Sequence, residues 1–151
     1  MNIPIEFNKV YTYTLQNYKI DCLTDEMCKE IFKDGRAFSH FIEPWLSIKF
    51  PLIHIKGCKQ YDFVNKNDKN IKYDEKTFTK RGCRYMPSNM IGQGREFDEE
   101  TFIKKASELK YIIVSNVKFP EIKIKFVSGI DLLKKYPNGI ITIKHYDEFF
   151  R

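Results

Sequence analysis

Three acidic residues and a lysine are the residue types of a site in which carboxylates hold a divalent metal ion and an ammonium group lies beside a phosphodiester. They are Asp62, Asp74, Glu75 and Lys76. Carboxylate oxygens are the ligands that Mg²⁺ prefers. A lysine ammonium orients a water molecule and offsets the charge that develops on a reacting phosphate. Chemistry of this kind requires a fold that brings these side chains to one place.

The residues around them predict a β-hairpin. Segments 61–65 and 71–77 are rich in aromatic and β-branched residues, and the polar residues between them are typical of a turn. Because side chains alternate along a strand, Asp74 and Lys76 share one face and the residue between them points to the other. If Asp62 faces the same way on the first strand, two carboxylates and one ammonium converge on a single patch.

The rest of the chain predicts a mixed α/β domain, residues 1–151, around one twisted sheet. A continuous apolar run at 111–117 is typical of a central strand that is buried on both faces. Because the hairpin is followed by a helix and then this run, segment 71–79 is expected inside the sheet, where charges need a partner or a function. The expected helices are 25–32, 37–46 (ended or bent by Pro44), 98–109 and 130–136, and the other expected strands are 9–20 (or an irregular arm), 52–55, 121–127 and 140–146.

Residues 80–95 form an aperiodic basic stretch that is too long for an ordinary turn. Arginine and lysine attract phosphates without reading sequence, whereas arginine, asparagine, glutamine and serine read base edges. The glycines at 92 and 94 allow close approach of the backbone to a phosphate. A solvated loop with ordinary turn glycines is the alternative. The candidate nucleic-acid contacts are Lys80, Arg81, Arg84, Ser88, Asn89, Gln93 and Arg95.

The net charge, the cysteines and the apolar runs indicate which partners and which cellular environment to expect. The net charge of +6 favours polyanionic partners. The cysteines, Cys22, Cys28, Cys58 and Cys83, lack zinc-ligand spacing, so we expect reduced thiols in a cytoplasmic protein. We expect no signal peptide and no bilayer-spanning segment, since no apolar run approaches about 20 residues.

The pattern of Asp62, Asp74 and Lys76 resembles the PD-(D/E)XK nuclease superfamily. An aspartate opens a hairpin, and the next strand carries an acidic residue, one intervening residue and a lysine. The order of the following helix and strands is similar too, and the resemblance covers about residues 41–146. It implies a mixed sheet flanked by helices, as in the core of type II restriction endonucleases. Tyr61 stands where the family often has proline.

The resemblance implies roles for individual residues. Asp62 and Asp74 would hold Mg²⁺ together with the backbone carbonyl of Glu75, and Lys76 would position the attacking water. A bulge that brings the Glu75 side chain to the metal in place of Asp74 is the alternative. Glu43, on the helix before the sheet, matches a helix glutamate of many relatives and would act through water, although a surface glutamate fits the same position.

The implied activity is Mg²⁺-dependent hydrolysis of double-stranded DNA at a defined sequence. The residues 80–95 also look like the loop that type II restriction endonucleases place against DNA. A homodimer with one site per strand would match a palindromic target. The alternatives are a structure-selective nuclease of DNA repair or recombination and a non-catalytic nucleic-acid-binding protein. His40, without a second ligand at metal spacing, is interpreted as a polar surface residue.

Overall fold

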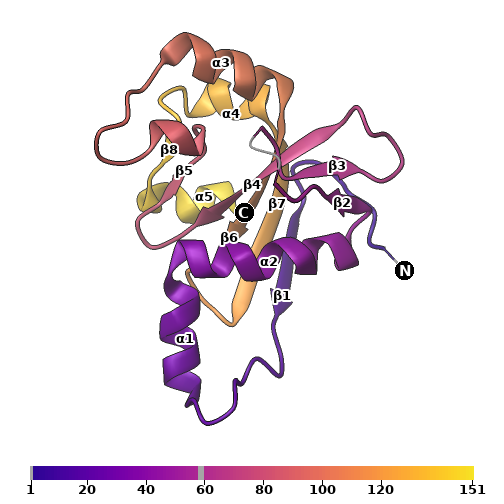
Figure 1. The fold of residues 1–151 in the computed structure, drawn as a ribbon, viewed down its shortest axis with the longest axis vertical. Helices are drawn as coiled ribbons and strands as arrows, with labels where there is room; N and C mark the ends of the chain where they lie inside the picture. Colours follow the sequence, from indigo (N-terminus) through magenta and orange to yellow (C-terminus); the bar gives the residue numbers. More distant parts are fainter. Residues whose placement is uncertain (1, 58–59) are drawn as a thin grey trace.

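A six-stranded mixed sheet organises the chain in our computed structural model, which describes residues 2–57 and 60–151 (Figure 1). The strands lie in the order β1-β7-β6-β4-β3-β2. Neighbours β4 and β6 are parallel, and the other neighbouring pairs are antiparallel. Their bounds are β1 Val10–Thr14, β2 Leu52–His54, β3 Phe63–Asn65, β4 Lys72–Phe78, β6 Lys110–Ser115 and β7 Glu121–Ser128. The predicted hairpin is therefore confirmed as β3 and β4, and β4 lies inside the sheet as predicted.

Four helices of the described chain begin where the sequence supplies a capping oxygen. Helix α1 (Asp25–Lys33) follows Thr24, whose hydroxyl accepts the Met27 N–H. Asp34 ends α1 and caps α2 (Gly35–Lys49) by accepting the Ala37 N–H, so one residue separates the two helices. Asp98 and Ser128 cap α3 (Glu99–Glu108) and α4 (Gly129–Lys135) in the same way. These side chains satisfy N–H groups that the first turn leaves without helical partners.

Each face of the sheet carries its own hydrophobic core. Helix α2 covers one face, where Phe38, Ile42 and Leu46 pack against strand residues that include Ile112. The helices α3, α4 and α5 (Tyr146–Phe149) cover the other face, where Ile113 is buried. Alternate residues of β6 thus enter different cores, which explains its continuous apolar sequence.

Two sequence predictions differ from the structure. Helix α2 continues through Pro44 to Lys49, beyond the predicted end at residue 46, because Pro44 lies on the exposed side and the buried stripe on either side of it holds the helix to the sheet. The predicted last strand ends after Ile141. The chain then turns through Ile143–His145 into α5, where burial of Phe149 and Phe150 against Phe78 favours a helix.

The strand β8 (Ile140–Ile141) pairs with β5 (Cys83–Arg84) in a separate two-stranded sheet. Part of the basic stretch 80–95 is therefore ordered and buried, not a solvated loop. Tyr85, Met86 and Met90 lie in the core beneath α3. This packing fixes the basic stretch beside β4.

The close contact of α3 and α4 depends on one glycine. A Cβ at Gly129 would lie 1.7 Å from the Ala106 carbonyl oxygen. The Gly129 N–H donates to the carbonyl of Leu109. A larger residue would force the two helices apart, and α3 borders the site described below.

Among residues 2–57 and 60–151, no helix combines the length and the apolar composition that a bilayer crossing requires. Cys28 and Cys83 are buried and Cys22 is exposed, each as a free thiol. Cys58 lies outside the described residues.

Candidate active site

The short β3 strand leaves one edge of β4 open beyond Tyr73. β3 pairs with β4 as far as Phe63 opposite Tyr73, and the Asp62 N–H then donates to the Tyr73 carbonyl over 2.9 Å. Next along the edge, the Glu75 N–H donates to Oδ2 of Asp62 over 2.8 Å. The Asp62 carboxylate thus takes the place of a further strand residue, and the backbone of β4 fixes its orientation.

Asp74 and Lys76 lie on one face of β4 as predicted. The Lys76 ammonium lies 3.5 Å from Oδ2 of Asp74, and it donates to the Met86 carbonyl over 3.1 Å. Only 13% and 12% of the Lys76 and Asp74 side chains are exposed, so water screens this ion pair poorly. The carbonyl of Met86, in the basic stretch, holds the lysine beside the carboxylate.

Glu75 points to the opposite face, toward α2. β4 and β6 pair residue for residue, with Glu75 opposite Ile112, so no bulge turns the Glu75 side chain toward Lys76. The carboxylate of Glu75 accepts from the Thr77 hydroxyl, which in turn contacts the Ser39 hydroxyl over 2.8 Å. In a strand, the N–H and the carbonyl of one residue point to the same edge. The Glu75 carbonyl therefore faces the open edge, as its N–H does.

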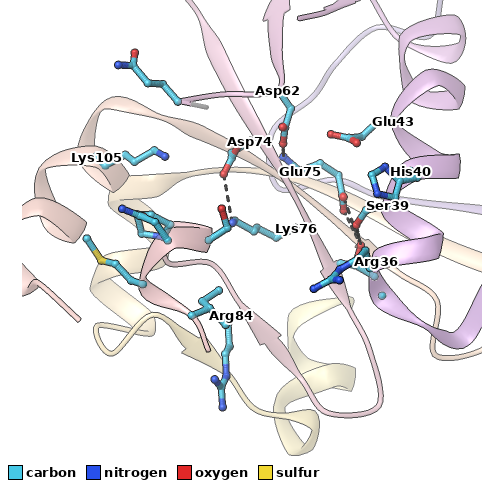
Figure 2. A pocket seen from close by; sticks show the side chains of 18 of the residues that line it. Arg36, Ser39, His40, Glu43, Asp62, Asp74, Glu75, Lys76, Arg84 and Lys105 are labelled. Carbon is cyan, nitrogen blue, oxygen red and sulfur yellow. Dashed lines mark hydrogen bonds and ion pairs between the residues drawn. The ribbon is translucent and has the colours of Figure 1, made fainter. Parts of the chain in front are cut away.

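Glu43 approaches the same edge from α2. Its carboxylate lies 3.9 Å from Nε2 of His54, and 17% of its side chain is exposed. Figure 2 shows Glu43, Asp62, Asp74 and Lys76 around a common space, with Glu75 reaching past them toward Ser39. We call Glu43, Asp62, Asp74 and Glu75 the acid cluster.

Burial raises the pKa of every carboxyl group in the acid cluster. The pKa of Asp74 rises to about 7 because of burial, although the Lys76 charge lowers it. Burial, reinforced by the Glu43 charge, raises the pKa of Glu75 to about 8. Burial also raises the pKa values of Asp62 and Glu43. At neutral pH the cluster therefore retains protons that a bound cation would displace.

The acid cluster borders a hollow of about 930 Å³, here called the acid hollow. No group of three or more His, Cys, Asp or Glu side chains in the described part of the chain is arranged to hold a metal ion. Mg²⁺ is commonly bound by one or two carboxylates, with water and substrate phosphate completing the shell. Asp62, Asp74 and the Glu75 carbonyl fit that smaller donor set.

The structure brings only part of the basic stretch to the acid hollow. Arg84, Ser88 and Asn89 line it and are exposed there. Lys80 and Arg81 instead line a separate hollow of about 380 Å³ near the start of α2. They lie outside the acid hollow because the chain turns at Gly82, whose φ of +94° and contact with the Ile141 carbonyl require glycine.

Gln93 and Arg95 are exposed and do not line the acid hollow. Nη1 of Arg95 donates to the Ser88 carbonyl, which closes the loop on itself. Gly92 and Gly94 have φ values of +110° and +77°, with open space where a Cβ would lie. Their left-handed conformation, not a close approach of another group, therefore explains glycine at both positions.

Sequence reasoning missed several polar residues that line the acid hollow. Helix α2 contributes Arg36, Ser39 and His40, and α3 contributes Thr101 and Lys105. His40 is thus exposed, as interpreted, but its exposed side faces the hollow. A helical spacing links Arg36, Ser39, His40 and Glu43, which together form a polar stripe beside the apolar stripe of α2. That spacing was the signal available in the sequence.

Comparisons with models of protein families, with curated proteins and with solved structures found no match for this chain.

Proposed function

We propose that this chain is a Mg²⁺-dependent endonuclease of double-stranded DNA with a PD-(D/E)XK-type core. One observation carries the proposal: Asp62, Asp74 and Lys76 meet at the open edge of an interior strand, within one hollow. Buried carboxyl groups with raised pKa values and an adjacent ammonium are typical of functional sites. In a purely structural role, such a cluster would be costly to bury.

Asp62, Asp74 and the carbonyl of Glu75 would hold Mg²⁺. When bound, Mg²⁺ would supply Lewis-acid stabilisation of the negative charge on the reacting phosphate. The three oxygen donors are already oriented, since the β4 backbone fixes Asp62 and the ion pair with Lys76 fixes Asp74. Little ordering would therefore be required when the ion binds.

Lys76 would orient the attacking water with its ammonium, which Asp74 and the Met86 carbonyl hold in place. The water oxygen bonds to phosphorus in line with the bond to the 3′ oxygen, and that bond breaks. The water gives up a proton to solvent, and the leaving 3′ oxygen takes up a proton from solvent. The products are a 5′-phosphate and a 3′-hydroxyl. Glu43 would act through a water molecule from the α2 side.

Double-stranded DNA is the proposed partner. Arg36, Arg84 and Lys105 place cations from three elements around the acid hollow, and such cations attract phosphates without regard to sequence. Ser88 and Asn89 are the donors best placed for base edges. A homodimer is proposed because a chain of 151 residues offers little surface for a long duplex site. A monomeric mass with DNA bound would contradict the dimer.

The test is a titration of Mg²⁺ or Mn²⁺ with supercoiled plasmid as substrate. The unmodified protein is expected to convert the plasmid to nicked or linear forms, whereas Asp74→Ala is expected to leave it intact. Asp147→Ala, which removes an exposed acid on α5, is the matched control and should cut normally. Cleavage of branched DNA but not of plain duplex would favour a structure-selective nuclease instead.

A further inference from the structure

A second hollow, of about 510 Å³, adjoins the acid hollow between α3 and the β3–β4 hairpin. Gln60, Thr101 and Lys105 line both hollows, so the two share a wall. Figure 2 shows the Lys105 side chain extending from α3 toward Asp74. A nucleic-acid strand with one phosphate at the acid cluster therefore passes Lys105 where it continues toward the second hollow.

The lining of this second hollow is cationic. Lys72, Lys104 and Lys105 contribute three ammonium groups, against a single carboxylate from Glu108. None of the three lysines has an ion-pair partner within the described part of the chain. We call it the lysine hollow.

Tyr61 orients one of these ammonium groups. The Lys72 Nζ lies 5.0 Å from the centre of the Tyr61 ring, which is half-buried against the core. A cation held over an aromatic ring keeps its charge and stays available to an anion. Lys104 and Lys105 extend from one turn of α3 on the other side of the hollow, so the charges approach from two elements.

We propose that the lysine hollow binds backbone phosphates of the nucleic-acid strand that continues from the scissile phosphate. The inference rests on the proposed function, because it places that phosphate at the acid cluster. A nucleic-acid strand carries one phosphate per nucleotide. A strand that continues past Lys105 therefore brings further phosphates to the lysine hollow. Ammonium groups contact phosphates without reading bases. The lysine hollow would therefore increase the affinity for nucleic acid and fix the position of the strand, but it would not select a base sequence.

The test compares Lys72→Ala/Lys104→Ala with the unmodified protein. Lys105 is left in place because it also lines the acid hollow. Binding of a labelled DNA duplex is measured by fluorescence anisotropy in EDTA, over a series of salt concentrations. Two lost phosphate contacts should flatten the slope of log K against log salt by about 1.8 and weaken binding at low salt by tenfold or more, on the order of the counterion effect.

Two further variants make the result specific. Lys19→Ala/Lys134→Ala removes the same charge from exposed positions that line neither hollow, and its slope should match the unmodified protein. Lys72→Arg/Lys104→Arg keeps the charge and should restore the slope. A slope in Lys72→Ala/Lys104→Ala equal to that of the unmodified protein would overturn the inference.

The same set of proteins separates this inference from the proposed function. If Asp74→Ala stops plasmid cleavage while the alanine pair leaves the slope unchanged, the nuclease stands and the lysine hollow fails. If the unmodified protein cuts no DNA but the alanine pair still flattens the slope, the lysine hollow stands as a nucleic-acid site. In that case the nuclease proposal fails.

Discussion

Replacing Asp74 by asparagine should make stability less dependent on pH. The folded pKa of Asp74 is raised from 3.8 to about 7, so the folded protein binds this proton more tightly than the unfolded chain does. A group of this kind destabilises the folded state as pH rises from the unfolded pKa to the folded pKa, and its effect is constant above that range. Asparagine keeps the size of the side chain without the charge.

The magnitude follows from the two pKa values. Between pH 5 and pH 8, a group that shifts from 3.8 to about 7 lowers the free energy of unfolding by about 2 to 3 kcal/mol. Glu75 and the other acids contribute to the pH dependence of both proteins. The difference between Asp74→Asn and the unmodified protein therefore reports Asp74 together with its coupling to Asp62.

The assay is urea unfolding followed by tryptophan fluorescence without divalent ions. Trp45 is the single tryptophan, and it lies on α2 and packs against Tyr13 of β1. Its fluorescence therefore reports the separation of α2 from the sheet on unfolding. Equal loss of stability with pH in both proteins would show that Asp74 does not bind its proton more tightly in the folded state. Mg²⁺ at tenfold above its dissociation constant should then stabilise the unmodified protein by about 1.4 kcal/mol, and it should leave Asp74→Asn unchanged.

Four other substitutions test the roles of Lys76 and Glu43 and the packing around Ile113 and Gly129. Lys76→Ala should lower the rate of plasmid cleavage by at least about 10²-fold with little change in anisotropy-measured DNA affinity, and a native rate would exclude its role. Glu43→Gln should slow cleavage by about tenfold or more without loss of folding, and an unchanged rate would make Glu43 structural. Ile113→Ala should lower the free energy of unfolding in urea by about 2 to 5 kcal/mol, because the residue is fully buried, whereas a loss below about 1 kcal/mol would contradict the assignment of this core. Gly129→Ala should cost at least about 1 to 3 kcal/mol by the same measurement, since its Cβ would overlap the Ala106 carbonyl, and native stability would contradict that contact.

The central geometry of the site could be predicted because local rules determine it. The period of two along a strand places Asp74 with Lys76 whatever the rest of the chain does. A short hairpin then brings Asp62 beside them, and the apolar sequence of β6 indicates that β4 is interior. These inferences require only the order of residues along each strand and the pairing of β3 with β4.

The surroundings of the site depend on tertiary packing and were harder to predict. Ser39 meets Thr77 only because α2 covers the face of the sheet to which Glu75 and Thr77 point. The basic stretch has no periodicity, yet its apolar side chains fill the core beneath α3, and this places Arg84 in the acid hollow while Lys80 and Arg81 lie elsewhere. The local sequence does not indicate which of these basic residues line the acid hollow.

The structure of the last residues also depends on tertiary packing and could not be predicted from local sequence. Residues 140–146 have strand-like composition, but β8 ends at Ile141. The aromatic residues that follow are buried against Phe78, and their packing outweighs the local preference for a strand.

Plasmid cleavage by Asp62→Asn, Asp74→Asn and Lys76→Ala, with the exposed-site control Asp147→Asn, decides whether the two aspartates and the lysine form a nuclease active site. We expect the unmodified protein and the control to cut in Mg²⁺ and not in EDTA, and to leave 5′-phosphates that a ligase can rejoin. We expect no cleavage by the three site variants. Cleavage by these variants at the native rate, or equal cleavage in EDTA, would contradict a site built on these acids and this lysine.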